Sequence, residues 1–265
     1  MRAAQRDGRL LGALLLIAAA AAAGAQQRAI PLAESRSGAS FAGSDLRAQQ
    51  ADDFSNPGML WVERGAKLWN SAPAAGAPSC AACHGDAKVS MKGVATRHPA
   101  FDPKSKKLLN LEGRINQCRA ANQKASSFAP ESEDLLAMTA FVAHQSRGLA
   151  FEVAIDGPAQ PHFERGREFY YRRVGQMNLS CAQCHEQNWG RRLLTETISQ
   201  GQPNAYPIYR LEWQTAGSLH RRLRSCLSGV RAELPPVGAP EFVDLELFLA
   251  WRAQGLKIET PGVRR

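Results

Sequence analysis

The sequence predicts a mainly α-helical protein made of two tandem domains related by duplication, with an N-terminal arm in front of them. The first observation behind this prediction is that the pattern Cys-x-x-Cys-His occurs twice, at residues 80–84 and 181–185. The second is that the residues before each motif also repeat, because Arg64-Gly65 recurs 101 residues later as Arg165-Gly166. A chain of 265 residues is long enough for two small domains, each with its own core.

Each Cys-x-x-Cys-His motif has the spacing that attaches a c-type haem. Two thiols about one helical turn apart can reach the two vinyl groups of a porphyrin, and the next residue places an imidazole under the iron. A redox-active cysteine pair or half of a zinc site would also use Cys-x-x-Cys, but the final histidine of both copies favours haem. The sequence therefore predicts two cytochrome c-like domains and two covalent haem c groups, with these anchoring cysteines and proximal histidines: Cys80, Cys83 and His84; Cys181, Cys184 and His185.

The N-terminus has the pattern of a secretory signal peptide. Three arginines precede an apolar run from Leu10 to Ala23, and Ala23-Gly24-Ala25 offers a small-residue cleavage site. A retained membrane anchor is the alternative, but the run is short for a span. We therefore expect cleavage after Ala25, a mature chain in the periplasm, and no membrane span after residues 1–25 are removed.

The chain is basic, with a formal net charge of +9, and removing three Arg and one Asp with residues 1–25 leaves +7. A basic surface favours anionic partners or substrates. We expect no nucleic-acid partner, because no recognition motif accompanies the charge and the chain is exported.

Turn signals divide the mature chain. Residues 26–55 show no sustained period and predict an extended N-terminal arm on the surface. Asn56-Pro57-Gly58 is a turn signal, and the apolar spacing after it predicts a helix over 59–70. A Gly/Pro-rich linker at 156–161 separates the two halves. The predicted boundaries of the domains are 56–155 and 156–265.

A terminal helix is expected to close each half. Each has an aspartate near its start and a glycine after its end, Asp134 with Gly148 and Asp244 with Gly255. Each half therefore reads as a helix, the haem motif, an irregular segment and a second helix, which is the plan of a small cytochrome c domain.

The second face of each iron decides what a cytochrome does. No methionine follows His185, so the usual methionine ligand is missing from the second half. The downstream donors are His220, Cys226 and Lys257, or the position is open. Met177 precedes the motif too closely and is interpreted as core filling.

Cys226 is the donor with chemical consequences. It lies in a basic stretch, residues 218–227, that is expected to be helical, and Arg222 stands one turn before it. A neighbouring guanidinium lowers the pKa of a thiol and offers a fork of donors to an oxyanion. The alternatives are a disulfide with Cys118 or an inert buried thiol.

The first half contains a parallel pair, because Cys118 follows Arg114 by the same four residues. Cys118 is therefore a candidate sixth ligand of the first haem. Other donors compete for this position, namely Met138, His98 and His144. Thiolate ligation would lower the potentials of both haems, because an anionic sulfur stabilises ferric iron.

The chain resembles the SoxA family, the dihaem subunits of the SoxAX cytochromes of bacterial thiosulfate oxidation, also called L-cysteine S-thiosulfotransferase subunit SoxA. The resemblance covers nearly the whole mature chain. It rests on these segments: Asp52-Asp53, Asn56-Pro57-Gly58, Val62-Glu63-Arg64-Gly65, both haem motifs, Cys118, and Arg222 with Cys226 followed by Val230-Arg231-Ala232-Glu233.

The resemblance implies a role for each matching residue. His84 and Cys118 would be the axial ligands of the first iron, and His185 and Cys226 those of the second. Cys226 would carry a persulfide as the catalytic residue, and Arg222 would bind substrate. The second domain would then be the catalytic one.

The resemblance also implies an activity and its partners. Thiosulfate would be coupled oxidatively to a carrier cysteine of SoxYZ, giving a cysteine S-thiosulfonate and two electrons. The monohaem cytochrome subunit SoxX would complete a heterodimer, and a small cytochrome c would accept the electrons. The alternatives are a dihaem thiosulfate dehydrogenase that forms tetrathionate, a periplasmic electron carrier without catalysis, and a dihaem peroxidase.

Overall fold

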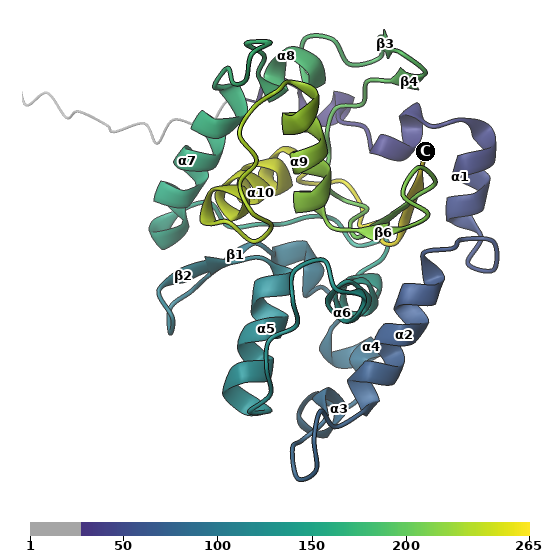
Figure 1. Ribbon diagram of the computed structural model, residues 1–265, viewed down its shortest axis with the longest axis vertical. Coiled ribbons are helices and arrows are strands. Elements are labelled where there is room, and N and C mark those ends of the chain that lie inside the picture. The colour runs from purple at the N-terminus through teal and green to yellow at the C-terminus, as the bar shows by residue number, and fades with distance from the viewer. Residues whose placement is uncertain (1–27) are drawn as a thin grey trace, which may run out of the picture.

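The computed structural model describes residues 28–265 and consists of two helical halves stacked on each other (Figure 1). The expected signal peptide and its cleavage site lie outside the described residues. The first half contains these elements: α2 (Met59–Asn70), α3 (Cys80–His84), α4 (Ala87–Ser90), η3 (Ala95–Arg97), β1 (Ala100–Asp102), β2 (Lys107–Leu109), α5 (Leu111–Asn122) and α6 (Glu133–His144). None of the described helices is both long and apolar enough to cross a membrane.

The second half follows a similar order of elements. It contains these: η4 (Gly157–Ala159), α7 (Gln160–Tyr171), α8 (Cys181–His185), β3 (Arg192–Leu193), β4 (Glu196–Thr197), β5 (Ile208–Arg210), β6 (Thr215–Gly217), α9 (Leu219–Gly229), α10 (Pro240–Arg252) and β7 (Gly262–Arg264). The predicted helix over 59–70 is confirmed as α2, and the stretch with Cys226 is helical as α9. The common ancestry of the halves stays a prediction.

The segment expected to be irregular holds one antiparallel hairpin in the first half and two in the second, where β3 also pairs with β4. In the first half β1 pairs with β2, and in the second half β5 pairs with β6. The parallel strand β7 joins β5 from the C-terminus and completes a three-stranded sheet. Three-residue strands carry too little periodic signal to be recognised in a single sequence.

Each half is centred on two helices that cross at a glycine. A Cβ on Gly65 in α2 would lie 2.2 Å from the carbonyl oxygen of Ala137 in α6, and one on Gly166 in α7 would lie 2.0 Å from that of Asp244 in α10. Only glycine allows backbones to approach this closely. The repeated Arg-Gly pair thus marks the two helix crossings.

The arginine of each pair binds the terminal helix at its acidic residue. Arg64 Nε donates to Asp134 at 2.8 Å, and Arg165 Nε donates to Asp244 at 2.6 Å. The second pair is less solvated, because the Asp244 side chain is only 6% exposed and also contacts His162. The Arg-Gly pair that repeats in the sequence therefore makes the same contact between the first and last helices of each half.

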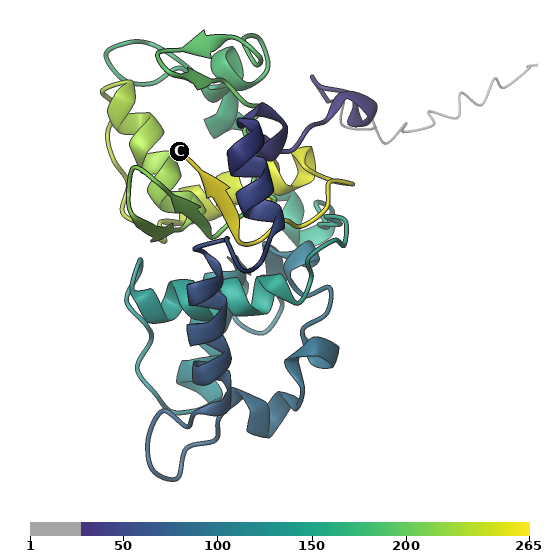
Figure 2. The ribbon, with the colours of Figure 1, turned by 90° about the vertical axis from the view of Figure 1, so that its right-hand side faces the viewer.

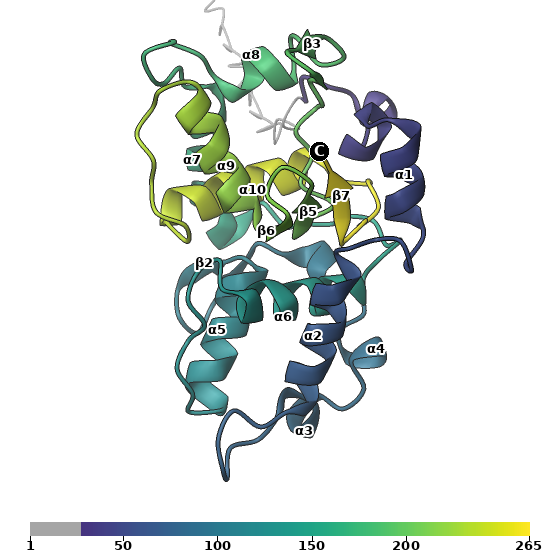
Figure 3. The same cartoon turned by 45° about the vertical axis from the view of Figure 1, so that its right-hand side comes forward.

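The N-terminal arm is not extended throughout, which corrects the expectation from sequence. It contains η1 (Leu32–Glu34), η2 (Gly38–Phe41) and α1 (Ser44–Ala51). Figures 2 and 3 show α1 beside β7, in the second half of the molecule. Gln50 of α1 fixes this helix against the C-terminal segment. Its buried side chain donates to Glu259 and accepts from the Val263 amide and from Arg264. These partners are more than 200 residues away, so local sequence could not indicate them.

The halves are joined by more than the linker. The backbone after α6 pairs with the C-terminal segment, where Phe151 N–H donates to Leu256 O at 2.9 Å and Ile258 N–H to Leu149 O at 2.8 Å. The Gly/Pro-rich stretch expected as a linker forms η4 and begins α7, with Pro161 in the first turn. Proline is tolerated there, because the first helical N–H groups have no partner inside the helix.

Candidate haem and sulfur site

The second Cys-x-x-Cys-His motif forms the short helix α8, which a capping box begins. The Ser180 hydroxyl accepts a hydrogen bond from Gln183 N–H at 3.4 Å, and the Gln183 side chain accepts one from Ser180 N–H at 2.9 Å. The two bonds satisfy amides that the helix start leaves free. The capped turn puts Cys181 and Cys184 on one helical turn, as covalent attachment of a haem requires.

His185 is held with one ring nitrogen available. Its Nδ1 lies 2.7 Å from the carbonyl oxygen of Ser199, and because a carbonyl only accepts, Nδ1 carries the proton. Burial lowers the pKa of His185 to about 4, so the ring is neutral at physiological pH. Nε2 therefore keeps its lone pair, which is the arrangement that a proximal iron ligand needs.

Gly201 fixes the plane of that imidazole. Its φ of +68° lies in the left-handed region, and a Cβ at this position would be 2.9 Å from the His185 ring. A glycine is required here for both reasons. The backbone of the loop after α8 can thus contact the ring while Ser199 O accepts the hydrogen bond from Nδ1–H.

Helix α9 brings Cys226 and Arg222 to the same place. The Ser218 hydroxyl caps its start by accepting from Arg221 N–H at 3.1 Å. Burial and, after it, the charge of Cys226 together raise the pKa of Cys181 to about 12, so the two sulfurs are electrostatic neighbours. The charge of Cys226 also raises the pKa of the Arg222 guanidinium. The structure therefore assembles one cluster from α8 and α9.

Arg222 is half-buried and has no acidic partner. Across residues 28–265, no carboxylate forms an ion pair with its guanidinium. Glu212, whose charge acts on it weakly, is bound to Arg210 at 2.8 Å. A guanidinium in this state can bind an oxyanion through a fork of charge-assisted hydrogen bonds.

The other donors expected near the second iron have different surroundings. His220 has both ring nitrogens engaged, since Nδ1 accepts from Gly238 N–H at 3.0 Å and Nε2 donates to Glu246 at 3.1 Å. The side chain of Lys257 is exposed. Among these candidates, Cys226 alone is a free donor beside α8.

The first motif forms α3 and is more open than the second. Trp69 supports its end, because the indole Nε1–H donates to Gly85 O at 3.1 Å and the ring lies 5.7 Å from the His84 ring. Cys83 and His84 are exposed. Burial raises the pKa of Cys80, and the charge of Cys118 contributes to this increase. The structure thus brings Cys118 near the first motif.

The alternatives to Cys118 are arranged unequally. Met138 is 3% exposed and packs in the core of the first half, together with Cys80. His98 Nδ1 donates to Val94 O at 2.9 Å, and the ring lines a cavity between the halves. His144 is in the last turn of α6, and burial lowers its pKa. Because Met138 lies in the same core cluster as Cys80, it stays an alternative ligand of the first iron.

No disulfide joins any two of the six cysteines, so Cys118 and Cys226 are not joined. They lie on helices of different halves, α5 and α9. The donors of the second half fit a covalently held haem. They are two thiols on one turn of α8, an imidazole with a free Nε2, and a third sulfur on α9. His185 and Cys226 would then hold the iron.

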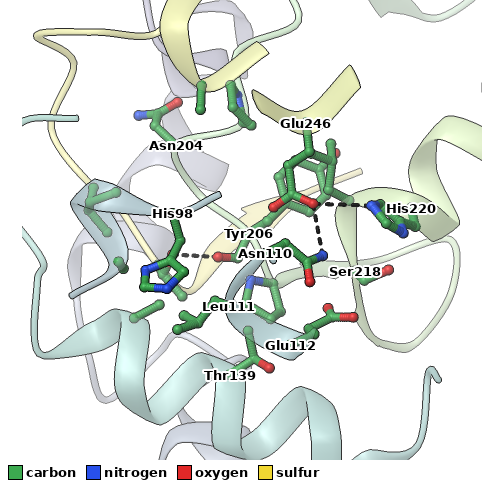
Figure 4. Close-up of a pocket in the computed structure, with 18 of the residues that line it drawn as sticks. His98, Asn110, Leu111, Glu112, Thr139, Asn204, Tyr206, Ser218, His220 and Glu246 are labelled. Carbon is green, nitrogen blue, oxygen red and sulfur yellow. Dashed lines mark hydrogen bonds and ion pairs between the residues drawn. The ribbon is translucent and has the colours of Figure 1, made fainter. Parts of the chain in front are cut away.

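A separate cavity of about 60 Å³ lies between the halves. Figure 4 shows Glu246 of α10 at its wall, accepting from Asn110 Nδ2 at 2.9 Å and from His220 Nε2 at 3.1 Å. Asn110 caps α5, and His220 is near the start of α9. One carboxylate oxygen thus ties together the starts of the two helices that carry Cys118 and Cys226.

Sequence analysis did not identify several residues of this site. Ser199 acts through its backbone carbonyl, which has no side-chain signature. Tyr206 and Arg252 are electrostatic neighbours of the sulfur cluster: Arg222 and Cys226 act on the pKa of Tyr206, and Arg252 acts on that of Cys181. Their distance in sequence from the motif concealed them.

Two helices with the Cys-x-x-Cys-His motif and an imidazole that keeps one nitrogen free define a c-type cytochrome, a class that holds haem c covalently. Residues 64–151 match the family model described as the SoxA/TsdA cytochrome c domain. The L-cysteine S-thiosulfotransferase subunit SoxA of Pseudaminobacter salicylatoxidans is 41% identical over 236 residues, 89% of this chain and 82% of that protein. The same subunit of Rhodovulum sulfidophilum is 41% identical over 231 residues, 87% of this chain and 80% of that protein.

A solved structure has the same fold. The crystal structure of SoxXA from P. pantotrophus superposes with a TM-score of 0.83 and 37% sequence identity, covering 87% of both chains. The chain therefore belongs to the SoxA family, and the resemblance inferred from the motifs is confirmed.

Proposed function

We propose that this chain is the dihaem catalytic subunit of an L-cysteine S-thiosulfotransferase. Cys80 and Cys83 would attach one haem and Cys181 and Cys184 the other. The proposed axial ligands are His84 with Cys118 and His185 with Cys226. Cys226, as a persulfide, is the proposed catalytic residue and Arg222 the proposed substrate-binding residue.

The observation that carries this proposal is the unpaired guanidinium of Arg222 beside Cys226. An electron carrier needs no such group, because even partial burial of a cation without a partner costs free energy. An anionic substrate would supply the missing charge, and thiosulfate is a dianion with oxygen atoms that a guanidinium fork can bind. The net charge of +7 that remains after residues 1–25 are removed favours the approach of such a substrate.

In the proposed reaction, thiosulfate and the thiolate of a SoxYZ cysteine join through a new S–S bond. The product is a cysteine S-thiosulfonate, and two electrons are released. Arg222 holds the sulfonate end of thiosulfate, which leaves the terminal sulfur directed at the sulfur of Cys226. The haem, when bound, supplies an acceptor for the electrons. The Nδ1 proton of His185 stays on that nitrogen and is donated in a hydrogen bond to Ser199 O, 2.7 Å away, so the ring remains neutral.

The proposed assembly follows from the family. The matched crystal structure is of SoxXA, so we infer a heterodimer with the monohaem subunit SoxX, and a small cytochrome c as the final acceptor. Covalent haem attachment and the apolar run near the N-terminus favour a periplasmic location with the signal peptide cleaved. SoxYZ is the proposed carrier protein.

The test is replacement of Cys226 by Ala in the complex with SoxX. Mass spectrometry of SoxYZ after incubation with thiosulfate and an electron acceptor should show no S-thiosulfonate, while Cys118→Ala, the matched change in the other half, should retain most coupling. Full coupling by Cys226→Ala would refute the assignment. Intact mass of the wild-type protein should give two haems and one extra sulfur on the Cys226 peptide.

Product analysis separates the main alternatives. Tetrathionate formed without any carrier protein would favour a thiosulfate dehydrogenase. Reduction and reoxidation without either product would favour an electron carrier. Arg222 would bind thiosulfate in either enzyme, so the expectation of S-thiosulfonate rests on the relatives, which are L-cysteine S-thiosulfotransferase subunits.

A further inference from the structure

The two halves present the same Arg-x-x-x-Cys sequence in matching structural frames. A hairpin comes first in each, with Asp102 opposite Lys107 in one and Arg210 opposite Thr215 in the other. The residue that caps the following helix stands eight positions before the cysteine in both halves. Every step lies 108 residues apart, so Asp102 and Arg210 occupy equivalent positions.

In the first half, this position holds a firmly fixed carboxylate. Asp102 Oδ2 accepts from Ser105 N–H at 2.9 Å, Ser105 Oγ–H at 2.6 Å and Gln117 Nε2–H at 2.7 Å. These hydrogen bonds hold its pKa well below the ordinary value, so it stays ionised. Its side chain is only 13% exposed.

That carboxylate faces the first-half arginine. Arg114 Nη1 lies 3.8 Å from Asp102 Oδ1 and donates to Gln117 Oε1 at 2.5 Å. Gln117 therefore bonds both members of the pair, next to Cys118 in the chain. The guanidinium of Arg114 is therefore already paired with the carboxylate of Asp102. Gln117, in the helix turn that carries Cys118, holds that carboxylate in place.

In the second half, the charge at this position is reversed. Arg210 pairs with Glu212 within its own turn and contributes no carboxylate to Arg222. Arg264, which is opposite Arg210 in the parallel strand pair, adds another guanidinium. Burial raises the pKa of Tyr206, and the charges of Arg222, Arg210 and Arg264 each oppose that rise, so three guanidinium groups act on one phenol. Arg264 is paired with Glu259 at 3.7 Å, which leaves Arg222 as the unpaired member among the described residues.

We propose that Asp102 prevents the first half from binding thiosulfate, and that its replacement by an arginine at the equivalent position 210 leaves the second half open to the anion. A fixed carboxylate both neutralises Arg114 and repels a dianion. This inference rests on the proposed function, since it takes Arg222 as the thiosulfate site. It assigns Asp102 as a specificity-determining residue of a protein with two similar sulfur sites.

The experiment measures thiosulfate binding to the oxidised SoxX complex, without carrier protein, by titration calorimetry and by electron paramagnetic resonance of the ferric haems. The wild type should bind one thiosulfate per chain and Asp102→Asn two, with thiosulfate now altering the resonance of the first haem. Asn keeps a side-chain acceptor for Ser105 and Gln117. Lys107→Ala, which removes a charge opposite Asp102 in the hairpin, is the control and should still bind one.

A second variant, made in the other half, tests the proposal even if Asp102→Asn does not fold. Arg210→Asp should weaken thiosulfate binding at the second haem at least about tenfold, because it builds the first-half arrangement beside Arg222. The proposal is overturned if folded Asp102→Asn gains no second site, if the wild type already binds two, or if Arg210→Asp binds as tightly as the wild type. Binding gained by Asp102→Asn over a wild type that binds none would support Asp102 and refute the proposed role of Arg222.

Discussion

The crossing of α7 and α10 can be tested by adding one methyl group, through Gly166→Ala. The new Cβ would lie 2.0 Å from Asp244 O and 3.0 Å from Leu245 N. These are backbone atoms, which cannot rotate away as a side chain can. The helices would have to separate by about 1 Å before the shortest contact reached 3.0 Å.

The expected loss of unfolding free energy follows from the packing that this separation of the helices would loosen. Phe163, Tyr170 and Phe248 pack across the crossing and are no more than 1% exposed. Overpacking of such a core costs about 1–3 kcal/mol, and contact with a backbone places this change at the upper end. The better helix propensity of Ala returns up to about 1 kcal/mol. We expect a net loss of about 1–2 kcal/mol, which is a fall in Tm of roughly 2–8 °C.

Thermal unfolding followed by circular dichroism measures this change, and the haem content of the purified protein shows whether α8 still receives its cofactor. The matched control is Gly229→Ala, at the end of α9, where a Cβ would meet nothing within 4 Å. The control should be unchanged or slightly more stable. A Gly166→Ala protein as stable as the control would refute the close crossing.

Three further predictions concern the site and its support. Burial raises the pKa of Glu112 to about 8 from 4.5, so the folded state keeps a proton that the unfolded state releases, and the unfolding free energy should fall as pH rises from about 4.5 to about 8; Glu112→Gln should remove that slope in urea titrations. Gly201→Ala should lower occupancy of the second haem and change its resonance, because the Cβ would lie 2.9 Å from His185; an unaltered spectrum would contradict the proposed ring contact. Asn110→Ala removes the α5 cap and a hydrogen bond to Glu246, so chemical denaturation should show a loss of about 1–3 kcal/mol, whereas a loss below about 0.5 kcal/mol would show that Glu246 does not tie the helices.

Much of the fold could be predicted because its signals are local. The helix over 59–70 has apolar residues at helical spacing, and the basic stretch around Cys226 forms a helix with Arg222 one turn earlier. The family could be recognised for the same reason, since short motifs carry it. The role of Arg64-Gly65 and its repeat was visible as a repetition, but its meaning as a helix crossing required the tertiary structure.

What the sequence by itself determined is the chemistry of the donors: two Cys-x-x-Cys-His motifs, no methionine after His185, and an arginine one turn before each remaining cysteine. What only the tertiary structure decided is how those donors differ. Arg114 meets the carboxylate of Asp102 while Arg222 meets none within residues 28–265, and His185 is oriented by a backbone carbonyl. The physical reason is that charge pairing and carbonyl contacts depend on distances across a hairpin or loop, and identical sequence spacings within a helix contain no information about them.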